Sequence, residues 1–174
     1  DFAELRGRYD RVGAAVLNLS GWYDESYGPV GAVTNYAGLV ATRDASATRT
    51  KLIVGPWVHG SDATGRPKAG HRTFGANSAI NYDRTVLDWM DRWLKNEQNG
   101  VMREPAVQVY VMGANEWRTG DRWPLPGIVA ETLHFGGART LTRARPNASR
   151  AASSYVSDPT DPVPSATRSN RTLR

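Results

Sequence analysis

The feature that most constrains the fold is a pair of short apolar runs with a helical pattern between them. The runs are AAVLNL at residues 14–19 and TKLIVG at 50–55, each the length of a strand buried on both faces. Between them, after Gly28-Pro29, apolar residues recur at the spacing of one helical face: Val33, Tyr36, Ala37 and Val40. A strand, a helix and a strand in this order predict a parallel sheet with a right-handed crossover.

The pattern changes in the second half of the chain. A glycine-rich loop at 60–70 leads into a predicted helix at 79–95, whose expected apolar face is Val86, Leu87, Met90, Trp93 and Leu94. The run VQVYV at 107–111 alternates with period two, which is typical of a sheet with one wet face, and 131–137 is a second candidate strand. We therefore expect an α/β part over residues 1–102 and the start of an antiparallel β domain over 103–174.

Charge and composition exclude several classes of protein. The net charge is +5, but residues 1–136 carry 15 basic and 15 acidic side chains, so the excess lies in the Arg-rich end at 137–174. That end is polar and rich in Ser, Thr and Pro, which is typical of a solvated segment and not of a nucleic-acid interface. No apolar run is long enough to cross a membrane, and the first ten residues do not resemble a signal peptide. Cysteine is absent, which excludes disulfides and a cysteine nucleophile. We expect a soluble protein, cytoplasmic or exported.

Two residues that can do acid–base chemistry follow the two predicted parallel strands. Asp24 comes shortly after the first and His59 shortly after the second. The carboxyl ends of neighbouring parallel strands lie side by side, so the two side chains are expected to meet. A carboxylate there can fix the tautomer of the imidazole, which then accepts a proton from a nucleophile. The chain contains no Gly-x-Ser-x-Gly elbow, so the nucleophile is expected outside it.

Other interpretations of these residues stay open on the sequence alone. Asp24 could cap the following helix, and His59 could be an ordinary loop histidine. A metal site at His59 and His71, twelve residues apart, has the wrong spacing for zinc, so no metal is expected. Trp22 and Trp57 each lie two residues before the acid or the base, where they could line a pocket or pack beneath it.

The ordered set of motifs resembles the cocaine esterase / X-Pro dipeptidyl-peptidase family of serine hydrolases. The segments are GWYD, GPWVHG, FGANSAI, DWMDRWLKN, VYVMGANEWR, DRWPLPG and SDPTDPVPS. The resemblance implies the C-terminal portion of an α/β-hydrolase sheet, followed by the beginning of a jelly-roll domain. It also implies that Asp24 and His59 are the acid and base of a triad whose serine lies upstream of this chain.

The resemblance also implies what such a protein acts on. The substrate would be a small-molecule acyl ester, an amide or a peptide, without a cofactor, a nucleic acid or a membrane. Family members place an aromatic residue shortly after the acid, where this chain has Ser26 and Tyr27; with Trp22 and Trp57 these form the expected substrate-binding set. The chain alone is expected to be inactive without the serine. The rival reading is an inactive fragment or a β-sandwich binding module.

Overall fold

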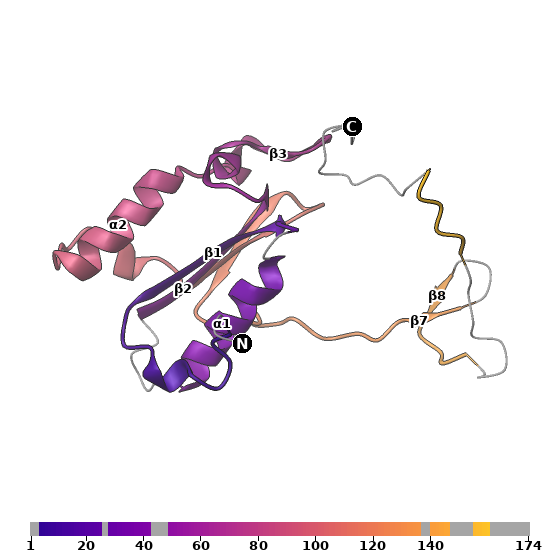
Figure 1. The fold of residues 1–174 in the computed structure, drawn as a ribbon, viewed down its shortest axis with the longest axis horizontal. Coiled ribbons are helices and arrows are strands. Elements are labelled where there is room, and N and C mark those ends of the chain that lie inside the picture. Colours follow the sequence, from indigo (N-terminus) through magenta and orange to yellow (C-terminus); the bar gives the residue numbers. More distant parts are fainter. Residues whose placement is uncertain (1–3, 26–27, 43–48, 137–139, 147–154, 161–174) are drawn as a thin grey trace. The chain divides into compact units, whose positions relative to one another are not determined.

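The computed structural model describes residues 4–25, 28–42, 49–136, 140–146 and 155–160 (Figure 1). Its internal contacts divide these residues into two units, one ending at Pro126 and one beginning at Gly127. The first unit contains the main sheet and both α-helices. The second contains a two-stranded antiparallel pair, β7 (His134–Phe135) with β8 (Leu141–Thr142). Each unit is described by itself below.

A four-stranded mixed sheet forms the centre of the first unit. Its strands are β1 (Val16–Tyr23), β2 (Thr50–Val58), β5 (Val107–Val111) and β6 (Glu116–Gly120), in the order β1-β2-β5-β6. The first three are parallel, and β6 returns antiparallel to β5 in a hairpin. Helix α1 (Gly28–Thr42) connects β1 to β2, so the predicted strand–helix–strand unit with parallel strands is confirmed.

Short elements fill the connections around this sheet. Helix α2 (Tyr82–Leu94) starts at Asn81, whose side chain accepts a hydrogen bond from the backbone N–H of Arg84 at 3.0 Å, a standard N-cap. The remaining elements are the 3-10 turns η1 (Tyr9–Arg11), η3 (Ser61–Gly65), η4 (Ala76–Ser78) and η5 (Val101–Arg103), and the strands β3 (Lys68–Ala69) and β4 (Arg72–Thr73). Strand β3 lies at the end of the predicted glycine-rich loop at 60–70, and β4 follows directly after that loop.

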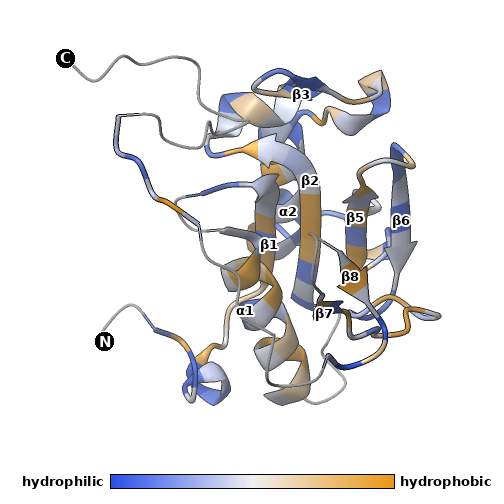
Figure 2. Ribbon diagram, turned by 90° about the vertical axis from the view of Figure 1, so that its right-hand side faces the viewer, coloured by the Kyte–Doolittle hydropathy of each residue, from blue (hydrophilic) through white to orange (hydrophobic). Residues whose placement is uncertain are grey.

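The core has two layers because side chains alternate across β2. Leu52 and Val54 point to one face, where they pack with Tyr36 of α1. Ile53 points to the other face and packs in a second cluster with Trp57. Residues 50–57 of β2 are all buried, as predicted for a strand covered on both sides, and the middle of this strand is coloured as hydrophobic in Figure 2. Strand β1 is only partly buried, because it is the edge strand of the described sheet.

The second half of the chain differs from its prediction at two places. Strand β5 does not open a separate antiparallel domain but pairs in parallel with β2, at Leu52–Val107 and two further positions. The break in contacts falls after Pro126. The domain boundary expected near residue 102 stays a prediction. Among the described residues of the second candidate strand, 131–136, only His134–Phe135 pair as a strand.

The expected apolar face of α2 is wrong in its orientation. Trp89 is 4% exposed and faces the protein, while Leu87, Met90 and Leu94 are exposed. Leu87 and Trp89 are two residues apart, which places them on nearly opposite sides of a helix. Because the larger indole of Trp89 is buried, the side of the helix that carries Leu87 faces outward from the described part of the chain.

Candidate active site

Asp24 lies one residue beyond the end of β1. Its backbone N–H donates to the carbonyl of Gly21 at 3.1 Å, which closes a turn at the carboxyl end of the strand. The residue stands four positions before Gly28, the first residue of α1. An N-cap residue directly precedes its helix, so Asp24 is too far from α1 for the capping role that the sequence left open.

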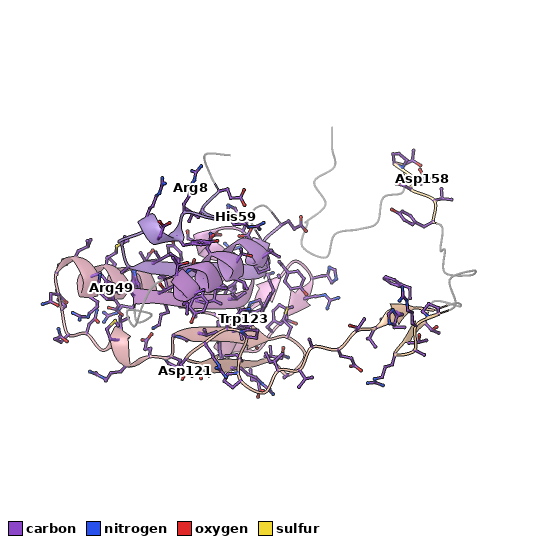
Figure 3. The ribbon with its side chains drawn as sticks, turned by 90° about the horizontal axis from the view of Figure 1, so that it is seen from below. Arg8, Arg49, His59, Asp121, Trp123 and Asp158 are labelled. Atoms are coloured by element: carbon purple, nitrogen blue, oxygen red, sulfur yellow. The ribbon has the colours of Figure 1, made fainter. Side chains whose placement is uncertain are left out.

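His59 lies one residue beyond the end of β2, and its ring meets the carboxylate of Asp24. The Nδ1 atom of His59 is 3.2 Å from Oδ2 of Asp24, although the residues are 35 positions apart. The imidazole is 56% exposed and the carboxylate 12%. Figure 3 shows His59 and Arg49, the residues that follow and precede β2, at opposite ends of this strand. The two predicted site residues are therefore brought together at the carboxyl end of the parallel strands.

The geometry of this pair determines what it can do chemically. An ionised carboxylate only accepts hydrogen bonds, so the contact at 3.2 Å requires the proton on Nδ1 of His59. The Nε2 atom then carries the lone pair in the neutral ring, which is the state of a general base. The partly buried carboxylate also stabilises the imidazolium that forms when the ring takes up a proton. The carboxylate is shielded and the imidazole is exposed. The imidazole can therefore exchange a proton with a group that approaches from outside the pair.

The predicted substrate-binding residues have different positions. Trp57 is 1% exposed, and its indole N–H donates to the carbonyl of Ser78 at 2.9 Å, which favours packing beneath the site over pocket lining. Trp22 is partly buried against the core, and its indole N–H donates to the carbonyl of Tyr110 at 2.8 Å. Ser26 and Tyr27 lie outside the described residues, so their proposed contact with substrate stays a prediction.

A row of aromatic rings supports the strand ends, and sequence reasoning missed it. Neighbouring rings have centroids 5.4 to 6.3 Å apart along the series Tyr23, Phe74, Tyr110, Trp117 and Trp57. The indole N–H of Trp117 donates to the carbonyl of Asn77 at 2.7 Å. Trp117 therefore packs within the first unit. The alternation of EWRTG after a Gly-Ala-Asn turn was the signal for its strand.

The other histidines lie elsewhere. His71 is exposed in the turn between β3 and β4, and His134 is in β7 of the second unit. Over the described ranges, no three His, Asp or Glu side chains are grouped so that they could hold a metal ion. Over the same ranges, neither α-helix has the length and apolar character of a membrane span.

A second charged pair lies near the opposite end of β2. The ammonium of Lys51, only 6% exposed in its side chain, forms an ion pair with Glu104, which is 54% exposed. It also donates to the carbonyl of Val101 at 3.3 Å. A cavity of about 450 Å³ between α2 and the sheet is lined in part by Lys51 and Glu104. The pair joins the start of β2 to the segment before β5, so we assign it a structural role.

Comparison with known proteins identifies relatives over most of the chain. Residues 99–172 match the model of the X-Pro dipeptidyl-peptidase C-terminal non-catalytic domain. The cocaine esterase of Rhodococcus sp. (strain MB1 Bresler) is 35% identical over 171 residues, which cover 90% of this chain and 28% of that protein.

Solved structures give the same picture. An aminopeptidase from a marine sediment archaeon, Thaumarchaeota archaeon, matches with a TM-score of 0.68 at 27% identity, covering 88% of this chain and 24% of that one. An α-amino acid ester hydrolase matches with a TM-score of 0.64 at 25% identity, covering 90% and 26%. The chain therefore spans about a quarter of the length of these relatives.

These findings define the class as α/β proteins related to hydrolases. They are the mixed sheet, the acid and histidine at its strand ends, and relatives that are esterases and peptidases. Within that class, the chain belongs to the cocaine esterase / X-Pro dipeptidyl-peptidase family.

Proposed function

We propose that this chain supplies the acid and the base of a serine hydrolase that cleaves acyl ester or amide bonds. The observation that carries the proposal is the 3.2 Å contact between Nδ1 of His59 and Oδ2 of Asp24. His59 acts as general base toward a serine and then as general acid toward the leaving group, while Asp24 holds its tautomer. The serine belongs to a segment outside residues 1–174 and forms the acyl-enzyme.

The placement of the pair explains why the nucleophile can come from another segment. The described sheet has β1 at one edge, and Asp24 follows β1 directly. A parallel strand added beside β1 would present its own carboxyl end at the same rim as Asp24 and His59. A serine on a turn after that strand would approach the exposed side of the imidazole.

The later part of the chain fits the start of a jelly-roll domain. Its support is the match of residues 99–172 to a C-terminal non-catalytic domain, together with the antiparallel pair β7–β8. We place the change from hydrolase part to β domain between residues 99 and 127, because β5 and β6 still pair with the main sheet. The second candidate function is a binding module without catalysis. The match of this later part to a non-catalytic domain is the specific observation that supports it.

Reconstitution of activity tests the proposal. The chain is co-expressed with the protein segment encoded directly upstream of Asp1, and hydrolysis of p-nitrophenyl esters is measured. We expect activity that falls by about 10⁴-fold or more in His59→Ala and in Asp24→Asn, as for loss of a triad member. The matched controls His71→Ala and Asp62→Asn change exposed side chains of the same unit and should retain activity.

Three outcomes separate the candidates. Full activity of His59→Ala would remove His59 from the mechanism. Absence of activity in the folded, reconstituted unsubstituted complex would favour the binding module. The chain expressed by itself should hydrolyse the esters no faster than its own His59→Ala variant, because the nucleophile is not among its residues; a rate that depends on His59 in the isolated chain would contradict the assignment of the serine.

A further inference from the structure

The register between β1 and β2 changes by one residue immediately before the acid–base pair. From Val16–Thr50 to Gly21–Gly55, partners on the two strands differ by 34 in residue number. At Tyr23–Val58 the difference is 35. Strand β2 therefore holds one residue more than β1 between these points, which is the definition of a β-bulge.

The shift decides whether Asp24 and His59 can meet. Their numbers also differ by 35, so they stand directly across from each other when the shifted register is continued by one residue. In the earlier register Asp24 would stand beside Val58, with His59 one position further on. Because side chains alternate across a strand, a slip of one residue turns the imidazole to the other face of the sheet. The 3.2 Å contact thus depends on the extra residue in β2.

Pro56 and Trp57 are the two residues of β2 inside the bulge. Pro56 has no backbone N–H to give to a neighbouring strand, and prolines inside sheets are found at edges or bulges. Trp57 is anchored from a third segment, since its indole N–H donates to the carbonyl of Ser78 at 2.9 Å. Its ring also packs against Trp117 at 5.8 Å between centroids. The bulged residue therefore has one fixed position.

The two glycines of the last regular pair leave room for the bulge. A Cβ on Gly21 would lie 2.1 Å from the carbonyl oxygen of Trp57, far inside contact distance. A Cβ on Gly55 would lie 2.4 Å from the indole ring of the same residue. The backbone of Trp57 thus occupies the space that a side chain at position 21 would fill, and its indole ring occupies the space that a side chain at position 55 would fill.

We infer that Trp57, seated against Gly21 and Gly55 and tied to Ser78, is a positioning residue that sets the register in which Asp24 faces His59. The inference rests on the proposed function of that pair. Trp57 touches no reacting atom in this assignment. It acts through the backbone of β2, by holding the extra residue that brings His59 to the same side as Asp24.

Nitrogen-15 NMR of the imidazole rings in the 174-residue chain provides the test. The chemical shifts of Nδ1 and Nε2 of His59 report which nitrogen carries the proton in the neutral ring, and His71 serves as an internal reference. Asp24 selects the Nδ1–H tautomer. Trp57→Phe keeps an aromatic ring but removes the hydrogen bond to Ser78, and we expect the ratio of Nδ1–H to Nε2–H tautomer to fall about fivefold, the size of one net hydrogen bond. Trp57→Ala should lower it further.

Trp89→Phe is the matched control, because Trp89 is also buried but lies on α2, away from the bulge. It should leave the ratio unchanged. A Trp57→Phe ratio equal to that of the unsubstituted chain would overturn the inference, whether or not Trp57→Ala folds. Asp24→Asn separates the two claims: if it leaves the His59 tautomer unchanged, the pair itself and the proposed function fail. If it changes the tautomer while Trp57→Phe does not, only the role of Trp57 fails.

Discussion

The substitution Gly21→Ala tests how tightly the two central strands are fitted at the base of the site. Gly21 is the last residue of β1 in the regular register, and it faces the backbone of Trp57. A methyl group there would stand 2.1 Å from the carbonyl oxygen and 2.6 Å from the carbonyl carbon of Trp57. Ordinary contacts begin near 3.4 Å, so the strands would have to separate by roughly 1 Å.

The cost follows from the nature of the neighbour. Overpacking a core by one methyl group costs about 1–3 kcal/mol, and the upper end applies because backbone atoms cannot change rotamer. Weakened ladder hydrogen bonds between β1 and β2 add about 1 kcal/mol. We therefore expect Gly21→Ala to lower the free energy of unfolding by about 4 kcal/mol. A separation of this size would also take Nδ1 of His59 beyond hydrogen-bond distance of Asp24.

Urea unfolding followed by tryptophan fluorescence measures this difference. The matched control is Gly31→Ala in α1, where an added Cβ meets no atom within 4 Å. Alanine is the better helix former, so this control should raise the free energy of unfolding by about 0.5–1 kcal/mol. The reasoning is refuted if the free energies of unfolding of Gly21→Ala and the unsubstituted chain differ by less than about 0.5 kcal/mol at an unchanged m-value. A difference that small is typical of surface substitutions.

Three further predictions concern groups away from the pair. Glu104→Gln should cost about 1–2 kcal/mol of unfolding free energy in urea titrations, less than a fully buried pair, because Lys51 is buried but Glu104 is half exposed. Tyr36→Phe should flatten the loss of stability at alkaline pH, since burial, and then the Asp121 carboxylate, raise the pKa of Tyr36 above 10.0. Asn81→Ala should cost about 1 kcal/mol by removing the cap of α2, measured by thermal unfolding.

Each of these has its own contrary result. For Glu104, the exposed pair Asp62–Arg66 is the comparison, and an equally small effect of Asp62→Asn and Glu104→Gln would contradict the special cost of the buried ammonium. For Tyr36, the phenol is neutral below its pKa, so stability is complete below about pH 10 and falls as the pH rises through the raised pKa of the folded state. Parallel pH profiles of Tyr36→Phe and the unsubstituted chain would contradict it. For Asn81, an unchanged melting temperature would do so.

The sequence was sufficient for the parts of the fold that depend on local pattern. The apolar runs at 14–19 and 50–55 predicted the two central strands, and the helical spacing between them predicted α1 and hence the parallel crossover. Placing Asp24 and His59 after these strands then predicted their proximity, which the 3.2 Å contact reproduces. Chain topology alone was enough here, because parallel neighbours end at the same edge.

The parts that failed depend on pairing between distant segments. The alternation at 107–111 fits a strand in either kind of sheet, and the run does not reveal that its neighbour is β2. The side of α2 that is buried could not be predicted either. Trp89 and the side that carries Leu87 are both apolar, and only the packing decides which of them is buried. The bulge left one local trace, a proline inside a central strand at Pro56.

The crossover from β1 through α1 to β2 has a consequence for how such a site can be inherited. Both members of the pair, and the bulge that aligns them, lie within the continuous stretch of residues 16–59. Genetic recombination with a break before residue 16 would exchange whatever precedes the stretch while leaving carboxylate and imidazole matched to each other. A break inside α1 would instead join strands of different parentage, so selection should tolerate gene shuffling before residue 16 better than within this block.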